Sequence, residues 1–518
     1  MNKYIYFFCA AIIALSACSK DAFNKYPDTV VTPPEQALST VADVKYWQNG
    51  FYTALRARVY GDFMQVTDIQ ADFLVASASF GNNYGAPHRW DFTAEDYDVR
   101  DIYGGYYSGI ANLNYFLKNV DNVELYSGED AAKVASEKAT VATAKGEAHI
   151  LRAFYYYNLV LRFAKDYEPS TASSDLGVVI MSEDEDPVHD RLARSTVAET
   201  YQFIENDIVL ARTYFTEAGV VAKYTALNKI GKDAMDAFEA RVALSTHKYD
   251  KAAELSESLL SKYTLAANQQ ALFNVWRNDS NASEVILRLS TVKAKENPNA
   301  NNVYLQSSTY RADYGITYYT PYFYPTERAI NLYAPADWRY DCYFSAEYCA
   351  HADGYIRGTI AVTKYLGNPG LYTNPNQPNF QQAPIVFRIA EQYLINAEAN
   401  YKLGNETKAL TAINDLRVKR GLTALAILTG TNLFDAIKTE RTMEMMYEGV
   451  RIDDLKRWGD PMPMRGNVPA ASGGVTTHVY TGVGYTSLSK PAGDNKFVWG
   501  IPKNDQSTNK NIVQNPGW

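Results

Sequence analysis

The stretch EAHILRAFYYYNLVLRFAK, residues 147–165, decides the fold of this chain. Its apolar side chains recur at i, i+4, i+7 and i+11 from Ile150 to Leu161, and further apolar residues widen this stripe. The spacing predicts a helix that is covered on more than one side. We therefore expect it to be the spine against which other helices pack, with the aromatic residues 154–157 in the core.

Residues that break helices lie on both sides of this stretch. Gly146 precedes the run and residues 166–169 follow it, although the helical pattern continues upstream to about Ala131. Helical periodicity also predicts helices at about 44–59 and 106–120.

The first seventeen residues are typical of a signal peptide. Lys3 supplies a positive charge, the apolar run 5–15 is too short to span a bilayer, and small residues end at Ala17. Because Cys18 follows directly, the segment is similar to the lipobox of a bacterial lipoprotein, which implies cleavage before Cys18 and its acylation. The alternative is an ordinary signal peptide in which Cys18 is incidental. Residues 18–43 are polar and Pro-rich, which predicts a lipidated tether.

The whole chain has 518 residues, of which 47% are hydrophobic and 21% charged, and its net charge is −8. This composition is that of a folded protein, and the length predicts several modules or one elongated repeat body. The negative charge argues against nucleic acid as a partner, since phosphates need clustered Lys and Arg.

An internal repeat predicts the scaffold. Residues 240–255 and 397–412 superpose at an offset of 157, and each reads as a helix, a tight turn and a second helix with small residues at the crossing. The predicted fold class is mainly α, a tetratricopeptide-like scaffold of helical hairpins with a large loop-rich inserted lobe. The scaffold is expected at 44–262 and 387–460, the lobe at 263–386, and an irregular segment at 461–518.

Two regions carry candidate ligand-binding residues. Within the first scaffold part, residues 61–104 lose helical periodicity and predict a long loop, which offers Asn83, Tyr84, Arg89 and Trp90. The predicted lobe has eleven tyrosines between positions 304 and 348, and we select Tyr310, Tyr319 and Trp338. Aromatic rings with polar tips suit amphipathic ligands such as sugars. The alternative is that many of these rings fill a small irregular core.

No motif in the sequence indicates a catalytic, cofactor or metal site. The six histidines contain no i, i+4 pair, and neither a nucleophile elbow nor a phosphate-binding loop is present. The acidic run 183–186 is expected to be a solvated loop. Cys342 and Cys349 remain open as a disulfide, which a shared helix would prevent, because seven residues there span roughly 10 Å.

The segment KTERTMEMMYEGVRIDDLKRW, residues 438–458, resembles the late signature of the SusD/RagB family of Bacteroidetes outer-membrane lipoproteins. Three further segments are similar to that family's motifs: Gly146, Ala148, Arg152, Ala153, Phe154, Tyr156 and Leu159; Ile413, Asn414, Arg417, Arg420 and Gly421; and Ile501, Pro502 and residues 514–518. The chain departs from the family at Asn509-Lys510-Asn511, where Asn-Pro-Asn is usual. The resemblance implies four tetratricopeptide-like helix pairs, display on the cell outer membrane, and a SusC-type TonB-dependent transporter as partner.

The resemblance implies a non-enzymatic protein that binds oligosaccharide and passes it to the transporter, but it transfers no ligand residue. Peptide binding is the alternative within the family. A helical-repeat adaptor for proteins would leave the tyrosines unexplained, and a glycoside hydrolase would need a carboxylate pair that no spacing singles out. We interpret the signature charges, Glu440 to Asp454, as packing and helix-surface ion pairs of the scaffold.

Overall fold

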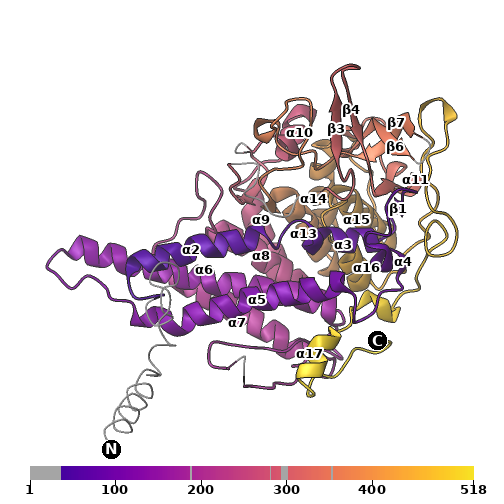
Figure 1. Cartoon of the computed structure of the whole chain (residues 1–518). Coiled ribbons are helices and arrows are strands. Elements are labelled where there is room, and N and C mark those ends of the chain that lie inside the picture. Colours follow the sequence, from indigo (N-terminus) through magenta and orange to yellow (C-terminus); the bar gives the residue numbers. More distant parts are fainter. Residues whose placement is uncertain (1–36, 187–188, 280–281, 293–301, 352–353) are drawn as a thin grey trace, which may run out of the picture.

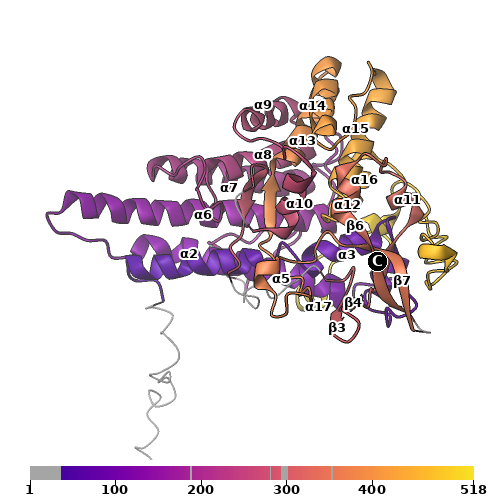
Figure 2. The same cartoon turned by 90° about the horizontal axis from the view of Figure 1, so that it is seen from above.

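The computed structural model describes residues 37–186, 189–279, 282–292, 302–351 and 354–518. Long helices run side by side at one end of the molecule, and small sheets and loops gather at the other (Figure 1). The same arrangement is seen from above (Figure 2). Cys18, the signal peptide and most of the tether lie outside the described residues. Within the described part, no helix combines the length and the apolar character needed to cross a membrane.

The first part of the chain forms a bundle around α6. Helix α6 packs against α2, α5 and α7. The elements in this part are α2 (Val41–Arg56), α3 (Asp62–Gln70), β1 (Leu74–Ala76), α4 (Gly85–Arg89), α5 (Tyr97–Asn119), η3 (Val120–Asn122), α6 (Ala131–Phe163) and α7 (Val197–Glu217). The predicted loop at 61–104 is therefore wrong, since α3, β1, α4 and the start of α5 lie within it. Short elements in this range bury most of their residues, polar ones included, through contacts with distant segments, which local periodicity does not reveal.

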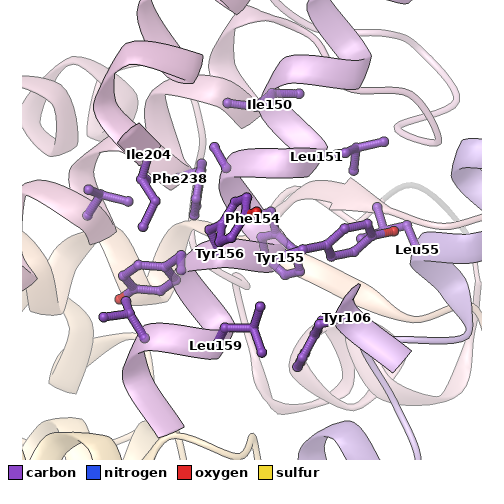
Figure 3. Close-up of a cluster of buried hydrophobic side chains, with 14 of the residues drawn as sticks. Leu55, Tyr106, Ile150, Leu151, Phe154, Tyr155, Tyr156, Leu159, Ile204 and Phe238 are labelled. Carbon is purple, nitrogen blue, oxygen red and sulfur yellow. The ribbon is translucent and has the colours of Figure 1, made fainter. Parts of the chain in front are cut away.

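The spine helix is confirmed and is longer than its decisive stretch. The Asp130 carboxylate caps it by accepting the backbone N–H groups of Ala132 and Lys133, and it ends at Phe163. Figure 3 shows side chains of α6 pointing in several directions into contacts with neighbouring helices. Residues 154–157 are buried, as expected. Gly146 does not begin the helix but lies inside it, where a Cβ would come within 2.4 Å of the Phe215 ring on α7.

The internal repeat forms two helical hairpins. They are α8 (Lys232–Ser245) with α9 (Tyr249–Leu260), and α13 (Ile389–Lys402) with α14 (Glu406–Val418). Ala240, Ala252, Ala397 and Ala409 are fully buried, so the helices of each hairpin approach closely. The hairpins stack because α13 packs on α9, where the Asn396 amide donates to the Ser256 hydroxyl at 3.2 Å. The mainly α, tetratricopeptide-like class is thus confirmed.

The inserted lobe contains more regular structure than its sequence indicates. Strand β2 pairs with β8, and these two strands bring the two ends of the insertion together. The strands β3-β4-β6-β7 form one sheet, and β1 pairs with β5. The elements of the lobe are α10 (Gln269–Arg277), β2 (Val285–Arg288), β3 (Ser308–Arg311), β4 (Ile316–Tyr319), β5 (Phe323–Pro325), α11 (Glu327–Ile330), α12 (Trp338–Tyr343), β6 (Phe344–His351), β7 (Gly354–Val362), η4 (Pro369–Leu371) and β8 (Ile385–Arg388).

Cys342 and Cys349 are both free and buried. They do not share a helix, because Cys342 lies on α12 and Cys349 on β6. Burial raises the pKa of the Cys342 thiol to about 12.

The charged signature lies on α15 (Gly430–Glu444) and α16 (Arg451–Trp458), and most of it is buried. The Glu444 carboxylate accepts hydrogen bonds from three guanidinium groups: Arg420 and Arg339 at 2.8 and 3.2 Å, and Arg388. The interpretation as scaffold ion pairs fits this geometry, but the expected helix-surface placement is wrong. Several of the pairs join elements far apart in the sequence, such as Glu444 with Arg339 and Arg388.

The C-terminal segment 461–518 has only short helices, η5 (Ser472–Gly474), η6 (Asn495–Phe497) and α17 (Lys503–Thr508). It returns along the lobe to the bundle (Figure 1). There the Trp499 backbone N–H donates to the Arg162 carbonyl at 2.7 Å, and Arg194 donates to the Asn515 side-chain oxygen at 2.8 Å.

Replacing Glu444 with glutamine is expected to lower the free energy of unfolding by about 3–5 kcal/mol, because three buried guanidinium groups lose their shared anion. Urea unfolding of the purified protein measures this. The control Asp101→Asn removes an exposed partner of Arg100 and should cost no more than about 1 kcal/mol. Equal effects of the two substitutions would contradict the buried network.

The same network has a defined pH dependence. Burial by itself would raise the pKa of Glu444, but Arg420, Arg388 and Arg339 outweigh it and hold this pKa well below 4.5. The stabilisation is therefore present above pH 4.5 and is lost as the pH falls toward the folded-state pKa. Glu444→Gln should lack this part of the acid dependence.

Gly146→Ala should destabilise the protein by about 1–3 kcal/mol, because the new methyl group overlaps the buried Phe215 ring at the crossing of α6 and α7. Gly104→Ala in α5 is the matched control. No atom lies within 4 Å of a Cβ there, so alanine should stabilise the helix by up to about 1 kcal/mol. Thermal unfolding of both variants measures the difference, and stabilisation by both would rule out the close crossing.

Candidate ligand-binding surface

The chain after β1 and the C-terminal segment lie side by side at the lobe. The Ala78 backbone N–H donates to the His478 carbonyl at 3.0 Å, and the Tyr480 N–H donates to the Ala76 carbonyl at 3.0 Å. This pairing brings Phe80, Tyr480 and Tyr485 together. The Tyr480 and Tyr485 rings are stacked with centroids 5.1 Å apart, and Phe80 meets Tyr480 edge-on at 5.2 Å.

Two predicted site residues contact this group of rings, and a third, Tyr84, follows one of them in the chain. Arg89 donates to the Asn82 side-chain oxygen at 2.8 Å, to Asp91 at 2.9 Å and to the Tyr485 hydroxyl at 3.4 Å. The Asn83 amide donates to the Phe80 carbonyl at 2.6 Å. We call Asn83, Tyr84, Arg89, Tyr480 and Tyr485, together with the buried Phe80 that supports them from below, the loop cluster.

Tyr84 is held in place within the loop cluster. Its backbone is left-handed, with φ 55°, and its hydroxyl donates to the Asp62 carboxylate at 2.7 Å. Burial, followed by the charge of Asp62, raises the pKa of the Tyr84 hydroxyl. Tyr84 therefore remains a neutral donor, and its ring is half-buried.

Trp90 does not join this surface. Its ring is buried against Phe497, with centroids 5.0 Å apart, and its indole N–H donates to the Gln70 carbonyl at 2.7 Å. It is a core residue in this structure. The sequence does not indicate that Trp90 is buried, because only the structure shows that α4 ends at Arg89 and that the chain then turns inward.

The three candidates from the lobe lie apart from each other. Tyr319 is buried on the inner face of the sheet, against a small core that includes Phe380. Tyr310 is half-buried on β3, paired with Thr317 of β4. Trp338 is half-buried at the start of α12, where its ring packs on Gly421, which has φ 81° and leaves no room for a Cβ.

The outer face of the four-stranded sheet carries tyrosines that the sequence reasoning did not select. Tyr318 lies 4.0 Å from Tyr355 and 5.8 Å from Tyr348 between ring centroids, and the Arg357 guanidinium lies 5.7 Å from the Tyr348 ring. Tyr355 is 56% exposed. We call Tyr318, Tyr348, Tyr355 and Arg357 the sheet platform. The alternation of faces along β4 separates Tyr318 from Tyr319, but the pairing with β6 and β7 was needed to assemble the set.

The sequence pattern does not reveal Tyr480 and Tyr485 either, because they fall in the segment 461–518, which predicts no regular structure. Tyr480 is 43% exposed. The only available signal was the isolated pair of tyrosines in a Gly-rich stretch. Among the described residues, no group of three or more His, Cys, Asp or Glu side chains could hold a metal ion.

Two family models match the chain. The model described as "SusD family" matches residues 339–518. The model described as "Starch-binding associating with outer membrane" matches residues 31–244. A search of curated proteins gave no significant match.

Solved structures share the fold over almost their whole length. A SusD superfamily protein from Bacteroides thetaiotaomicron is 23% identical with a TM-score of 0.74, and the match covers 92% of this chain and 100% of that one. A putative sugar-binding protein from Bacteroides vulgatus is 21% identical with a TM-score of 0.72, covering 93% and 99%. A laminarin-binding SusD-like protein is 18% identical with a TM-score of 0.66, covering 93% and 100%.

At these identities the solved structures show the fold alone. The two family models together match most of the chain, and the matched ranges include the segments that carry the sequence signatures. The chain belongs to the SusD family, whose second matching model is described as starch-binding and associated with the outer membrane.

Proposed function

We propose that this protein is a lipid-anchored, surface-exposed nutrient-binding protein of the outer membrane, which captures oligosaccharides and delivers them to a SusC-type TonB-dependent transporter. Membership of the SusD family supports a sugar as the ligand and the outer membrane as the location. The signal sequence before Cys18 supports the anchor. The transporter partner follows from the family resemblance.

The observation that carries the ligand class is the loop cluster. The stacked rings of Tyr480 and Tyr485 offer a rigid aromatic surface, and Arg89 lies within hydrogen-bonding reach of one of them. Aromatic rings cover the C–H faces of sugar rings, while guanidinium and amide groups bond the hydroxyls. Of the predicted residues, Asn83, Tyr84 and Arg89 stay in this proposal, and Trp90 and Tyr319 leave it because they are buried.

The sheet platform offers a second aromatic surface for the same ligand. Its three rings stand on adjacent strands of one sheet, so their spacing is fixed by backbone hydrogen bonds. Fixed rings lose little conformational freedom on binding. Tyr310, on the neighbouring strand β3, is paired with Thr317 and therefore lies on the opposite face of the sheet from Tyr318, so it leaves this proposal.

The site favours binding over hydrolysis. The two carboxylates that bond to side chains of the loop cluster are already engaged, Asp62 with the Tyr84 hydroxyl at 2.7 Å and Asp91 with Arg89 at 2.9 Å. A glycosidase needs one carboxyl group free to give a proton and a second free to act as nucleophile or base.

Tyr480→Ala and Tyr485→Ala should each weaken oligosaccharide binding by about three- to tenfold, which is the range for loss of one aromatic contact. Isothermal titration with laminari- and malto-oligosaccharides measures the change. Tyr46→Ala on α2 is the matched control, because Tyr46 is an exposed tyrosine of the bundle. Unchanged affinity in both cluster variants would move the site elsewhere, and binding of peptides without any oligosaccharide would overturn the sugar assignment.

Cys18→Ala should release the protein from the membrane fraction and abolish incorporation of labelled palmitate, because the acyl chains supply the anchor by burying their methylenes. The test uses the full chain in a host that processes lipoproteins. Thr29→Ala, in the expected tether, should leave both properties unchanged. An unlabelled, soluble wild-type protein would contradict the lipid anchor.

A further inference from the structure

A cavity of about 120 Å³ lies between the helical bundle, the hairpins and the lobe, and none of the surface tyrosines named above lines it. Its walls come from α6, α8, α13 and α16, together with residues 58–64 and the α15–α16 turn. A cavity of this size has room for several water molecules or for one small organic molecule.

Several buried polar atoms on the cavity wall lack a hydrogen-bond partner among the described residues. They are the Arg162 Nε, the Arg441 Nη1, the Trp276 Nε1 and the Asp166 Oδ1. Arg162 and Arg441 are each only 5% exposed. Buried polar groups are nearly always satisfied, so the side chains that line the cavity keep unused hydrogen-bonding capacity.

Asp453 on α16 also lines the cavity, and its carboxylate accepts no hydrogen bond within the described part of the chain. Burial raises its pKa, and the nearby Arg162 guanidinium acts against this shift. The opposite charges of Asp453 and Arg162 therefore attract each other, although the two side chains share no hydrogen bond. A bridging molecule that donates to Asp453 and accepts from Arg162 would satisfy both.

The balance of charge selects the class of that molecule. Arg441 is neutralised by Asp454 at 2.8 Å, and Arg241 is paired with Glu391. Arg58 on the same wall donates to two backbone carbonyls. An anion would face Asp453 and Asp166, and a cation would face Arg162 and Arg441. Hydroxyl groups both donate and accept, so they match this mixed wall without adding charge.

The rest of the wall is mostly apolar and includes several aromatic rings. Phe154 and Tyr157 of α6, with Trp276 and Tyr365 of the lobe, supply flat surfaces, and the Trp276 N–H is unbonded. Such surfaces cover the C–H groups of a compact polyol.

We propose that this central cavity is a binding site for one small neutral polyol, up to the size of a single sugar ring, held by Asp453, Asp166, Arg162 and Arg441. This site is separate from the loop cluster and the sheet platform. It does not rest on capture of oligosaccharides at the surface. Because its walls belong to both the bundle and the hairpins, an occupant would also strengthen their contact.

Titration of the full mature chain with glycerol, xylose and glucose tests the proposal, with glycine as a zwitterionic probe. At least one polyol should bind saturably with a dissociation constant of about a millimolar or below, and should raise the melting temperature. Asp453→Asn, which keeps the side-chain shape, should weaken this binding by about tenfold or more, because a charged acceptor is lost.

Asp166→Asn provides the same readout if the first variant fails to fold. Asp435→Asn is the matched control, since Asp435 is an exposed residue of α15 with a side chain that is 67% accessible. Tyr480→Ala should leave polyol binding unchanged, which separates the cavity from the surface. A crystal soaked with the bound polyol should show it beside Asp453.

Four outcomes would overturn the proposal: no saturable polyol binding, preferential binding of glycine, polyol binding that survives both aspartate variants, or a soaked crystal with water alone in the cavity. Loss of oligosaccharide binding in the wild-type protein, with polyol binding retained, would instead count against the surface function only.

Discussion

The structure depends on one carboxylate, that of Glu444, which is buried among the guanidinium groups of Arg339, Arg388 and Arg420. These arginines come from α12, from the end of β8 and from the turn after α14. A buried ion without partners would cost several kcal/mol of free energy, so these elements stabilise one another's positions. The lobe, the return strand into the scaffold and the last hairpin are thereby fixed to the same point.

This constraint explains how a long insertion can carry a defined surface. The insertion leaves and re-enters the scaffold through the paired strands β2 and β8, and Glu284 beside β2 is held by Arg420, which also binds Glu444. The same ionic centre therefore sets the position of the lobe relative to the helices. The loop cluster and the sheet platform are built on that fixed base, with their rings supported by strand pairing and by the C-terminal segment.

The candidate site was predictable only in part. Asn83, Tyr84 and Arg89 could be selected because a short stretch rich in Gly, Asn and aromatic residues is typical of a binding loop. Trp90 and Tyr319 carry the same chemical groups but face inward, since α4 ends at Arg89 and since neighbours on β4 point to opposite faces. Contacts between segments distant in sequence bring Tyr480 and Tyr485 into the loop cluster, and Tyr348 and Tyr355 into the sheet platform. No local sequence pattern reveals these contacts.

The sequence by itself determined the spine helix, the repeated hairpins and the membership of the family, because helical period and signature spacing are local properties of the chain. It also identified the charged signature as part of the scaffold. Only the tertiary structure decided that this signature is buried, that residues 61–104 are folded, and that a cavity with unbonded polar atoms lies between α6 and α16. Burial, strand pairing and cavities arise from contacts between distant segments, so their free energy is set by packing and not by any single stretch of sequence.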